Sequence, residues 1–557
     1  MTTQIIEKKP KIKTTYFALR HAKIAISLVP ENSNVLITNL YLRQRNSIKE
    51  HIFPFELIKK NIGNKCHYKC SIDISTYMDS IEPSFWDVVV EAKLDNGSCK
   101  FILSGLSTWL KIKLILFPRW TKINHNYIIY PFINGARQFS IQYRKYEKKY
   151  DNYFFILKEY LALFCYFILK PFWDRKKLWL VCEKFCSMAQ DNAFYFFKYC
   201  MENLPESEKK HIYYVMDSSA KDAKALLPYK NNVIEFMSFK YMIWLCAAQY
   251  LISTDAIRHF YIWDSPNSVY KVLYQMRKHL IFLQHGVMGF KRCHGTYRKS
   301  GNNRMALFVT SSQYEKDIIK EYFQYDDSEI IVTGLPRWDV IKDTSSLQNK
   351  HILIMPTWRK WLENVSHQSF TDSDYFKNYT KLLKNPRLEQ ILTTYHITLD
   401  FYLHPKFRSY IDTFSTRNPN INMISFGDLP LNQLLMRCNM LITDYSSVAW
   451  DVYYQEKPVI FYSFDLDTYN QHQGSYMDLR TEAFGDVVVT VDQLLNQIEH
   501  YISNNFTESQ LATNKRDILL PIRDNHNSKR IYEAIKSCKF KSKLISRLSK
   551  NKLQKNT

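Results

Sequence analysis

The chain has 557 residues, more than one hydrophobic core usually serves, so we expect two or three domains. Hydrophobic residues make up 46% and charged residues 23%, which is a globular composition, and the formal net charge is +23. The 12 glycines form neither a GxGxxG fingerprint nor a P-loop of the GxxxxGKS or GxxxxGKT type, which disfavours a Rossmann dehydrogenase and a P-loop NTPase.

The cysteines and the N-terminus bear on the compartment. Eleven cysteines are scattered, and the pairs Cys66/Cys70 and Cys182/Cys186 each enclose three residues, which is not the usual spacing of a zinc knuckle or a redox motif. We therefore expect mostly buried, reduced thiols and a cytosolic protein. The first residues contain no apolar h-region, so we expect no signal peptide.

Residues 1–148 differ in texture from the rest of the chain. Short runs at 24–29, 35–38, 86–91 and 127–131 are rich in β-branched and aromatic residues and are separated by turn formers. This pattern predicts a β-rich, sandwich-like domain. It carries no cluster of candidate catalytic residues, so we interpret it as an accessory or docking module.

Residues 149–177 are expected to form an amphipathic helix. The uninterrupted apolar run at 160–169 is about half of what a membrane span requires, and Lys158, Glu159 and Lys170 bracket it. One interpretation is a helix in the membrane interface, with the basic residues 175–177 reaching lipid phosphates. The other is a buried helix that links two domains.

The basic tail, residues 536–557, has eight Lys or Arg and no acid between positions 536 and 555. Such a tail can lie on an anionic membrane surface or contact a polyanion, or it can be a solvated end of the chain. Nucleic acid is not expected as a partner, because no zinc-finger or RNP-type signature accompanies the charge.

From residue 178 onward, buried strands alternate with helices. The first series of apolar runs falls at 178–182, 211–216, 250–253, 279–283, 307–310 and 330–333. The second falls at 351–355, 397–403, 421–425, 440–443 and 458–462. The alternation predicts two open α/β lobes of Rossmann type in tandem, at 178–345 and 346–535.

Polar side chains follow these strands where each one ends. In an open parallel sheet, ligands bind outside the carboxyl ends of the strands, so we expect these residues to gather where a cleft between the lobes would open. Cations can neutralise phosphate oxygens, hydroxyls can donate to them, and a histidine can act as a general base. The candidates are His285, Gly286, Arg337, Thr357, Trp358, Arg359, His404, Lys406, Thr443, Asp444, Ser446 and Ser447.

The stretch 441–451 shows the pattern most directly. An apolar run stops at Thr443 and Asp444, passes Ser446 and Ser447, and resumes with helical spacing. It predicts a buried strand that feeds a helix whose start can hold an anion such as phosphate, although an ordinary helix cap gives the same pattern. There is no HExxH motif and no clustered acidic set in these turns, so we expect no metal site.

Seven motifs together resemble a known family. They lie at 284–286, 310–316, 333–339, 356–359, 404–405, 443–447 and 457–462. In order and spacing they are similar to the motifs of the CDP-glycerol glycerophosphotransferase family, the teichoic acid and capsule poly(polyol phosphate) polymerases and primases. The resemblance extends from residue 178 to about 535, and residues 189–192 and 197–199 look like the entry to that catalytic domain.

The resemblance implies a GT-B-like fold, peripheral attachment to the cytoplasmic face of the bacterial membrane, and no cofactor. It implies transfer of a polyol phosphate from CDP-glycerol or CDP-ribitol to a lipid-linked polyol phosphate acceptor. By matching motif, His285 would be the base and His404 would contact or protonate the phosphate region. The donor site would be lined by Arg337, Thr357, Trp358, Ser446, Ser447 and Asp451.

One departure and two rival functions stay open. Many family members have His-Gly-Thr-Pro where this chain has His-Gly-Val-Met at 285–288, so the residues that follow His285 depart from the family pattern. A glycosyltransferase on the same scaffold would transfer a sugar from a nucleotide. A non-catalytic protein would bind membrane or polyanion through the β-rich domain and the basic tail.

Overall fold

The computed structural model describes most of the chain and divides it into two compact units. The described residues are 10–45, 52–63, 65–77, 83–94, 97–116, 120–123, 126–134, 138–262, 279–301, 303–363, 365–414, 416–425 and 427–538. Unit 1 comprises Met1–Lys170 with Tyr261–Arg277, and unit 2 comprises Pro171–Phe260 with Lys278–Thr557. The first nine residues, for which no signal peptide was expected, and most of the predicted basic tail, at 539–557, lie outside the described residues.

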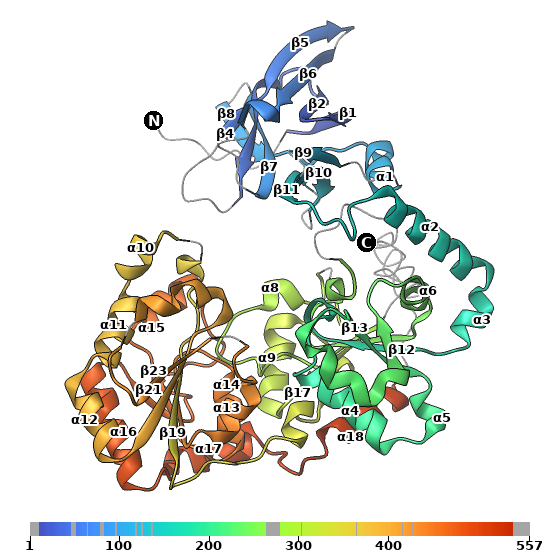
Figure 1. Ribbon diagram of the computed structural model, residues 1–557. Coiled ribbons are helices and arrows are strands. Elements are labelled where there is room, and N and C mark those ends of the chain that lie inside the picture. The colour runs from blue at the N-terminus through green and yellow to red at the C-terminus, as the bar shows by residue number, and fades with distance from the viewer. Residues whose placement is uncertain are drawn as a thin grey trace. The chain divides into compact units, whose positions relative to one another are not determined.

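Unit 1 contains two antiparallel sheets (Figure 1). The smaller has the order β1-β2-β6-β5, formed by β1 (Ile12–Arg20), β2 (Lys23–Pro30), β6 (Lys65–Asp73) and β5 (Glu56–Ile62). The larger has the order β4-β3-β7-β11-β10-β9, with β8 paired to β7, formed by β3 (Leu36–Gln44), β4 (Ile52–Pro54), β7 (Ser84–Leu94), β8 (Gly97–Ile102), β9 (Thr121–Ile123), β10 (Tyr127–Ile133) and β11 (Phe139–Lys145).

The alternating apolar residues of these strands form one shared core. Leu28 of β2 and Val88 of β7 are fully buried in the same hydrophobic cluster. The short helices of the region are η1 (Ile74–Tyr77) and α1 (Thr108–Leu116). The strands agree with the β-rich character predicted for this part of the chain.

Helix α2 (Tyr153–Ile168) follows the sheets. It begins at Asn152, whose side chain accepts a hydrogen bond from the backbone N–H of Phe155 at 2.7 Å. Ala162 and Leu163 are buried, but many apolar side chains of the same helix are exposed. Among the residues that the structure describes, no helix combines the length and apolar character that crossing a bilayer demands.

The first lobe of unit 2 is a parallel sheet with the order β14-β13-β12-β15-β16-β17-β18. Its strands are β12 (Trp179–Cys182), β13 (Ile212–Met216), β14 (Val233–Glu235), β15 (Tyr250–Ser253), β16 (His279–Phe282), β17 (Leu307–Thr310) and β18 (Ile330–Val332). Its helices are α3 (Lys170–Asp174), η2 (Lys184–Cys186), α4 (Asn192–Asn203), α5 (Glu206–Lys209), η3 (Lys221–Asn232), α6 (Phe239–Ala247), η4 (Ile257–Phe260), α8 (His294–Tyr297), α9 (Gln313–Phe323), η5 (Asp327–Glu329) and η6 (Pro336–Asp339).

The second lobe is a parallel sheet with the order β21-β20-β19-β22-β23-β24. Its strands are β19 (Lys350–Met355), β20 (Ile397–Tyr402), β21 (Ile421–Ile424), β22 (Met440–Thr443), β23 (Val459–Tyr462) and β24 (Asp486–Val488). Its helices are η7 (Lys360–Leu362), α10 (His367–Thr371), α11 (Asp374–Leu383), α12 (Pro386–Thr394), η8 (Pro405–Phe414), α13 (Leu431–Arg437), α14 (Val448–Tyr454), α15 (Leu466–His472) and α16 (Val491–Ser503).

Two further helices carry the chain back to the first lobe. Helix α17 (Gln510–Leu519) contacts α9, and α18 (Asn527–Ser537) packs on α4 and η6 (Figure 1). Asp339 accepts hydrogen bonds from the backbone N–H groups of Asn527, at 2.7 Å, and Ser528, at 2.8 Å, and so holds the start of α18. Helices α17 and α18 thereby connect the second lobe to the first.

Both parallel sheets reverse strand order at a switch point. In the first lobe β13 and β15 lie on opposite sides of β12, and in the second lobe β20 and β22 lie on opposite sides of β19. Ligands of open α/β sheets bind beside such points, at the carboxyl ends of the strands. In the second lobe the candidates Thr357 and Ser446 follow β19 and β22, which lie at this point, whereas in the first lobe His285 and Arg337 follow β16 and β18, farther along the same edge.

Candidate functional site

His285 is paired with a carboxylate that the sequence motifs had not included. Its ring Nδ1 lies 2.5 Å from Oδ2 of Asp191, and its side chain is 72% exposed. Because a carboxylate only accepts, the proton of this bond sits on Nδ1, and Nε2 is the nitrogen that can exchange a proton with a substrate. His285 follows β16 directly, and Asp191 caps the start of α4.

Arg337 joins this pair to the second lobe. Its Nη1 donates to Oδ1 of Asp191 at 2.9 Å and to the backbone oxygen of His285 at 3.0 Å. Its Nε and Nη2 donate to both oxygens of Asp451, on α14, at 2.7 and 2.9 Å. Trp338 also donates to Asp451, at 2.7 Å. Four of the five guanidinium N–H donors are thus engaged by protein, so Arg337 bridges the lobes more than it faces a ligand.

The backbone around His285 is held as firmly as the ring. Asn192 donates from its side chain to the backbone oxygen of Gln284 at 2.9 Å and accepts from the N–H of Arg337 at 3.0 Å. Gln284 has a φ of 63°, and its side-chain nitrogen donates to the backbone oxygen of Val309 at 2.5 Å. A non-glycine residue in the left-handed region is kept there by such surrounding bonds.

The charges around the pair shift their protonation. The nearby Asp191 carboxylate raises the pKa of His285 to about 9, and the positive charge of Arg337 opposes the rise. Burial would raise the pKa of Asp191, but the attraction of His285 and Arg337 lowers it overall. Glu183, which accepts backbone hydrogen bonds from Gln190, Asp191 and Phe194, has its pKa raised to about 8 by burial and by the adjacent Asp191.

Gly286 brings the two lobes into direct contact. A Cβ at Gly286 would lie 2.4 Å from Oγ of Ser447 and 2.8 Å from its Cβ. Ser447 precedes α14 and makes no side-chain cap hydrogen bond, and Ser446 and Ser447 are both half-buried. The structure therefore places Ser447 beside the His285 turn, and both serines stay candidates for substrate contact.

His404 has an environment opposite to that of His285. Its Nδ1 accepts a hydrogen bond from the backbone N–H of Lys406 at 3.2 Å, so its proton lies on Nε2. Burial, together with Lys291 and Lys406, lowers the pKa of His404 to about 3. A neutral imidazole can donate a hydrogen bond from Nε2, so phosphate contact, one of the two roles expected of His404, stays a proposal.

Trp358 lies between two cations that come from different lobes. The Nζ of Lys291, in the loop after β16, is 4.7 Å from its ring centroid, and the Nζ of Lys406 is 3.7 Å from it. Lys406 also pairs with Glu363 at 2.6 Å. Lys291, Lys406 and the neutral His404 together form a group suited to an anionic ligand such as a diphosphate.

Arg359 occupies a different position from the one expected. Its side chain is fully buried, with its Nη2 2.8 Å from Asp444 and its Nε 2.6 Å from Asp465. Asp444 also accepts from the N–H of Thr357 at 2.8 Å, and the hydroxyl of Thr443 donates to the backbone oxygen of Met355 at 2.6 Å. We therefore correct the expected ligand role of Arg359, Thr443 and Asp444, because these groups are buried against one another inside the second lobe.

Thr357 keeps one unused polar atom at the carboxyl end of β19. Its hydroxyl oxygen is buried and has no hydrogen-bond partner, while its backbone is fixed by Asp444. A buried hydroxyl without a partner costs free energy, roughly 1–3 kcal/mol, unless a ligand supplies the bond. Thr357 thus stays a candidate for substrate contact.

Several residues of this site were missed by the sequence reasoning. Asp191 and Asn192 lie in a segment that was noted only for its resemblance, and Glu183 and Lys291 were not singled out as site residues. Glu183 directly follows the end of β12, which was the signal used for the other candidates, whereas Lys291 lies nine residues beyond the end of β16. Among the described residues, no group of three or more His, Cys, Asp or Glu is placed to hold a metal ion.

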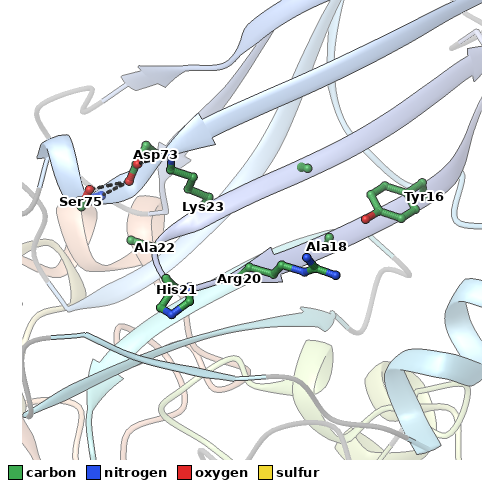
Figure 2. A pocket seen from close by; sticks show the side chains of 9 residues that line it. Tyr16, Ala18, Arg20, His21, Ala22, Lys23, Asp73 and Ser75 are labelled. Carbon is green, nitrogen blue, oxygen red and sulfur yellow. Dashed lines mark hydrogen bonds and ion pairs between the residues drawn. The ribbon is translucent and has the colours of Figure 1, made fainter.

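A separate hollow lies on unit 1, with a volume of about 570 Å³. Its lining comes from β1, β2 and the turn between them, from the end of β6 and from η1 (Figure 2), and comprises Tyr16, Ala18, Arg20, His21, Ala22, Lys23, Ala25, Asp73 and Ser75. Its only acid, Asp73, already accepts from Ser75 at 2.5 Å and pairs with Lys23 at 3.5 Å. It has no carboxylate-bound histidine of the kind found at His285.

Comparisons with known proteins agree with the motifs. A family model described as CDP-Glycerol:Poly(glycerophosphate) glycerophosphotransferase matches residues 164–537. The minor teichoic acid biosynthesis protein GgaB of Bacillus subtilis is 29% identical over 420 residues, covering 72% of this chain and 44% of that protein. The teichoic acid poly(ribitol-phosphate) polymerase of Bacillus spizizenii is 26% identical over 336 residues, covering 54% of this chain and 48% of that protein.

A solved structure of the wall teichoic acid polymerase TagF covers 68% of this chain and 96% of its own, with a TM-score of 0.47 and 16% identity. The chain spans about half the length of the curated relatives it matches. Because the family model covers more than half of the sequence, the resemblance stated from the motifs is confirmed, and the chain belongs to the CDP-glycerol:poly(glycerophosphate) glycerophosphotransferase family.

Proposed function

We propose that the chain transfers glycerol phosphate, or a related polyol phosphate such as ribitol phosphate, from a CDP-activated donor to a lipid-linked acceptor, with release of CMP. The setting is teichoic acid or capsular polymer synthesis. Family membership supports the reaction class, and one structural observation carries the assignment to a site. That observation is the exposed His285 ring bound to Asp191 beside Ser447, at the edge where both parallel sheets end.

The proposed reaction is an in-line displacement at the phosphorus that carries the polyol. An acceptor hydroxyl oxygen forms the new P–O bond, the bond to the CMP oxygen breaks, and the hydroxyl proton passes to Nε2 of His285. Catalysis of this kind is mostly positioning and charge stabilisation. Lys291, Lys406 and the Nε2–H of His404 lie where they can stabilise the diphosphate, and Thr357, Ser446 and Ser447 offer hydroxyls.

The two parallel sheets support a GT-B-like arrangement, in which the donor binds the second lobe and the acceptor approaches the first. Each sheet has a Rossmann-type strand order, and α17 and α18 return to the first lobe. In this proposal Trp358 and Asp451 serve the donor side, Trp358 by contact with the ligand and Asp451 by fixing Arg337. Unit 1 acts as an accessory module.

We place the protein at the cytoplasmic face of the membrane as a peripheral protein, with an anionic lipid surface as partner. Helix α2 supports this, because large apolar side chains along it are exposed at helical spacing. They include Tyr153 at 73%, Phe154 at 77%, Leu157 at 54%, Phe164 at 62% and Ile168 at 59%. An amphipathic helix of this kind binds the interface through its apolar side and through nearby cations.

Vesicle sedimentation tests the lipid contact. The double variant Phe154→Glu/Phe164→Glu is expected to lose binding to anionic phospholipid vesicles. The matched control is Ile518→Glu, which charges an equally exposed apolar side chain on α17. Equal binding by both variants would remove α2 from the proposal.

The reaction is tested by CMP release. Purified protein is incubated with CDP-glycerol or, separately, CDP-ribitol, with a polyol phosphate lipid in a membrane mimetic as acceptor. Acceptor-dependent CMP from one donor is the expected result and names the polyol. A glycosidic product from a nucleotide sugar would instead assign a glycosyltransferase, and folded protein that binds lipid without CMP release from either donor would indicate a binding protein.

A further inference from the structure

We propose that Asp191 is the positioning residue of His285, and that Arg337 connects it to Asp451 so that the second lobe helps to hold the imidazole. The inference deepens the proposed function and rests on it for the identity of the reaction. It assigns Asp191 a role in orienting the ring without contact to the substrate. It also assigns Arg337 to the support of this pair, whereas the sequence had placed it on the donor phosphate.

The first step of the argument is that the Asp191 carboxylate is immobile. Asp191 caps α4, its own backbone N–H donates to Glu183 at 2.8 Å, and its Oδ1 accepts from the N–H of Asn192 at 2.8 Å. Arg337 donates to the same Oδ1 at 2.9 Å. Asp191 is 9% exposed, so water competes little for these bonds. Oδ2 is left for the histidine.

The second step is that ring and backbone of His285 are fixed by the same cluster. Asp191 accepts a hydrogen bond from the ring Nδ1 of His285, and Arg337 donates to the backbone oxygen of the same residue. Asn192 donates to the backbone oxygen of Gln284. A carboxylate on Nδ1 selects one tautomer and leaves Nε2 to act, which is the logic of the Asp–His pair in hydrolytic triads. If Asp191 served only to pack the protein interior, the ring of its partner His285 would have no reason to be exposed to solvent.

The third step is the connection between the lobes. Asp451 lies on α14, the helix that Ser447 directly precedes, and it holds Arg337 through two hydrogen bonds of 2.7 and 2.9 Å. Arg337 and Asp451 are 13% and 3% exposed at their side chains, so their attraction is little weakened by solvent. A movement of α14 relative to the first lobe would therefore be transmitted to Asp191 and His285.

The chain supplies a matched control. Asp400 in the second lobe also binds a histidine, His351, at 3.1 Å and an arginine, Arg437, at 2.6 Å. It is 1% exposed and lies within β20, away from the strand ends. Replacing either aspartate by asparagine removes the same charge from the same kind of cluster, so a purely structural role predicts similar consequences for both.

The experiment compares Asp191→Asn with Asp400→Asn in the full chain, with two readouts. The first is CMP release. The second is carbethoxylation of His285 by diethyl pyrocarbonate as a function of pH, followed by peptide mass spectrometry, since only the neutral imidazole reacts. The second readout reports on His285 whether or not a donor is turned over.

We expect Asp191→Asn to lower the maximal rate of CMP release about 100-fold with little change in donor KM, a typical size for loss of oriented proton transfer. We expect its carbethoxylation midpoint to move from about 9 toward the ordinary 6.5, because the attraction of Asp191 is gone. Asp400→Asn should leave both the rate of CMP release and the carbethoxylation midpoint of His285 unchanged. If Asp191→Asn does not fold, Asp191→Glu keeps the charge and should retain the high midpoint while losing rate.

An unchanged midpoint in folded Asp191→Asn would overturn the proposal, and so would equal effects of the two asparagine variants. Wild-type protein that releases no CMP, together with the expected midpoint shift, would contradict the proposed reaction and still support the pairing. The two readouts thus separate failure of the positioning role from failure of the function.

Discussion

The two His–Asp–Arg clusters of unit 2 share their residue types and differ in where the fold puts them. Asp191, His285 and Arg337 meet at the carboxyl ends of the strands, with the His285 side chain 72% exposed. Asp400, His351 and Arg437 meet inside the second lobe, with the His351 side chain 13% exposed. His351 is the second residue of β19, at the end of the strand opposite Pro356 and Thr357.

The difference teaches that a buried carboxylate and a histidine do not make a reactive site by themselves. In the second cluster Asp400 is also bonded by Asn422 at 3.1 Å, and hydrogen bonds from His351, Asn422 and Arg437 lower its pKa against the effect of burial. That cluster stabilises the contact between neighbouring strands. In the first cluster the imidazole is held on one side and open on the other, which is what proton transfer requires.

Exchanging the histidines for alanine gives the largest expected contrast. His285→Ala should lower acceptor-dependent CMP formation roughly 1,000-fold while donor binding persists, because the general base is lost and the exposed ring contributes little to packing. His351→Ala should keep the rate and lower the melting temperature. Turnover close to wild type in His285→Ala would remove this residue from the mechanism.

Arg359 is a charged side chain that is fully buried in the second lobe, and it can be compared with the partly exposed Lys406. Arg359→Ala leaves Asp444 and Asp465 without their partner inside the second lobe, and we expect a loss of about 3–5 kcal/mol in the free energy of unfolding. The matched variant is Lys406→Met, since Lys406 is 40% exposed and its pair with Glu363 should contribute less than about 1 kcal/mol.

Urea unfolding measures both effects, and donor KM separates the roles. Lys406→Met should raise the donor KM with nearly native stability. Arg359→Ala with native stability and a raised donor KM would restore the substrate role that the sequence had suggested for Arg359.

Gly286 gives a smaller and more local effect. A methyl group there would overlap Ser447, so Gly286→Ala must shift the His285 turn or the start of α14. We expect about a tenfold loss in CMP formation, because a displacement of about 1 Å at a reacting group already slows transfer. Gly295→Ala is the control, since a Cβ there meets nothing within 4 Å. Equal rates for the two variants would show that the contact between Gly286 and Ser447 is not needed.

Much of the second unit was predictable from sequence, because long buried apolar runs between helices specify parallel strands. Every run predicted from residue 178 onward corresponds to a strand in the structure. The strands β14 and β24 were missed because each has only three residues and one of them is acidic. A three-residue run that includes an acid shows no apolar pattern in the sequence. These residues form strands because β14 pairs with β13 and β24 pairs with β23.

The site was predictable only where a residue follows its own strand. His285, Ser446, Ser447, Trp358 and Lys406 were singled out that way and stay candidates for the site. Asp191 stands 94 positions before His285, and no local pattern reveals that the fold pairs them. Arg359 shows the converse failure, because an arginine after a strand looks the same whether it faces a ligand or is enclosed by an aspartate 106 positions later.

The pH dependence of acceptor-dependent CMP formation by the wild-type protein tests the central claim most directly. With the pKa of His285 near 9, roughly one molecule in a hundred has a neutral imidazole at pH 7, so a base that takes the acceptor proton becomes more available as pH rises. The account predicts a rate that rises about tenfold per pH unit and levels off near pH 9. A rate that instead falls as pH rises through this range would make His285 a proton donor and contradict the account.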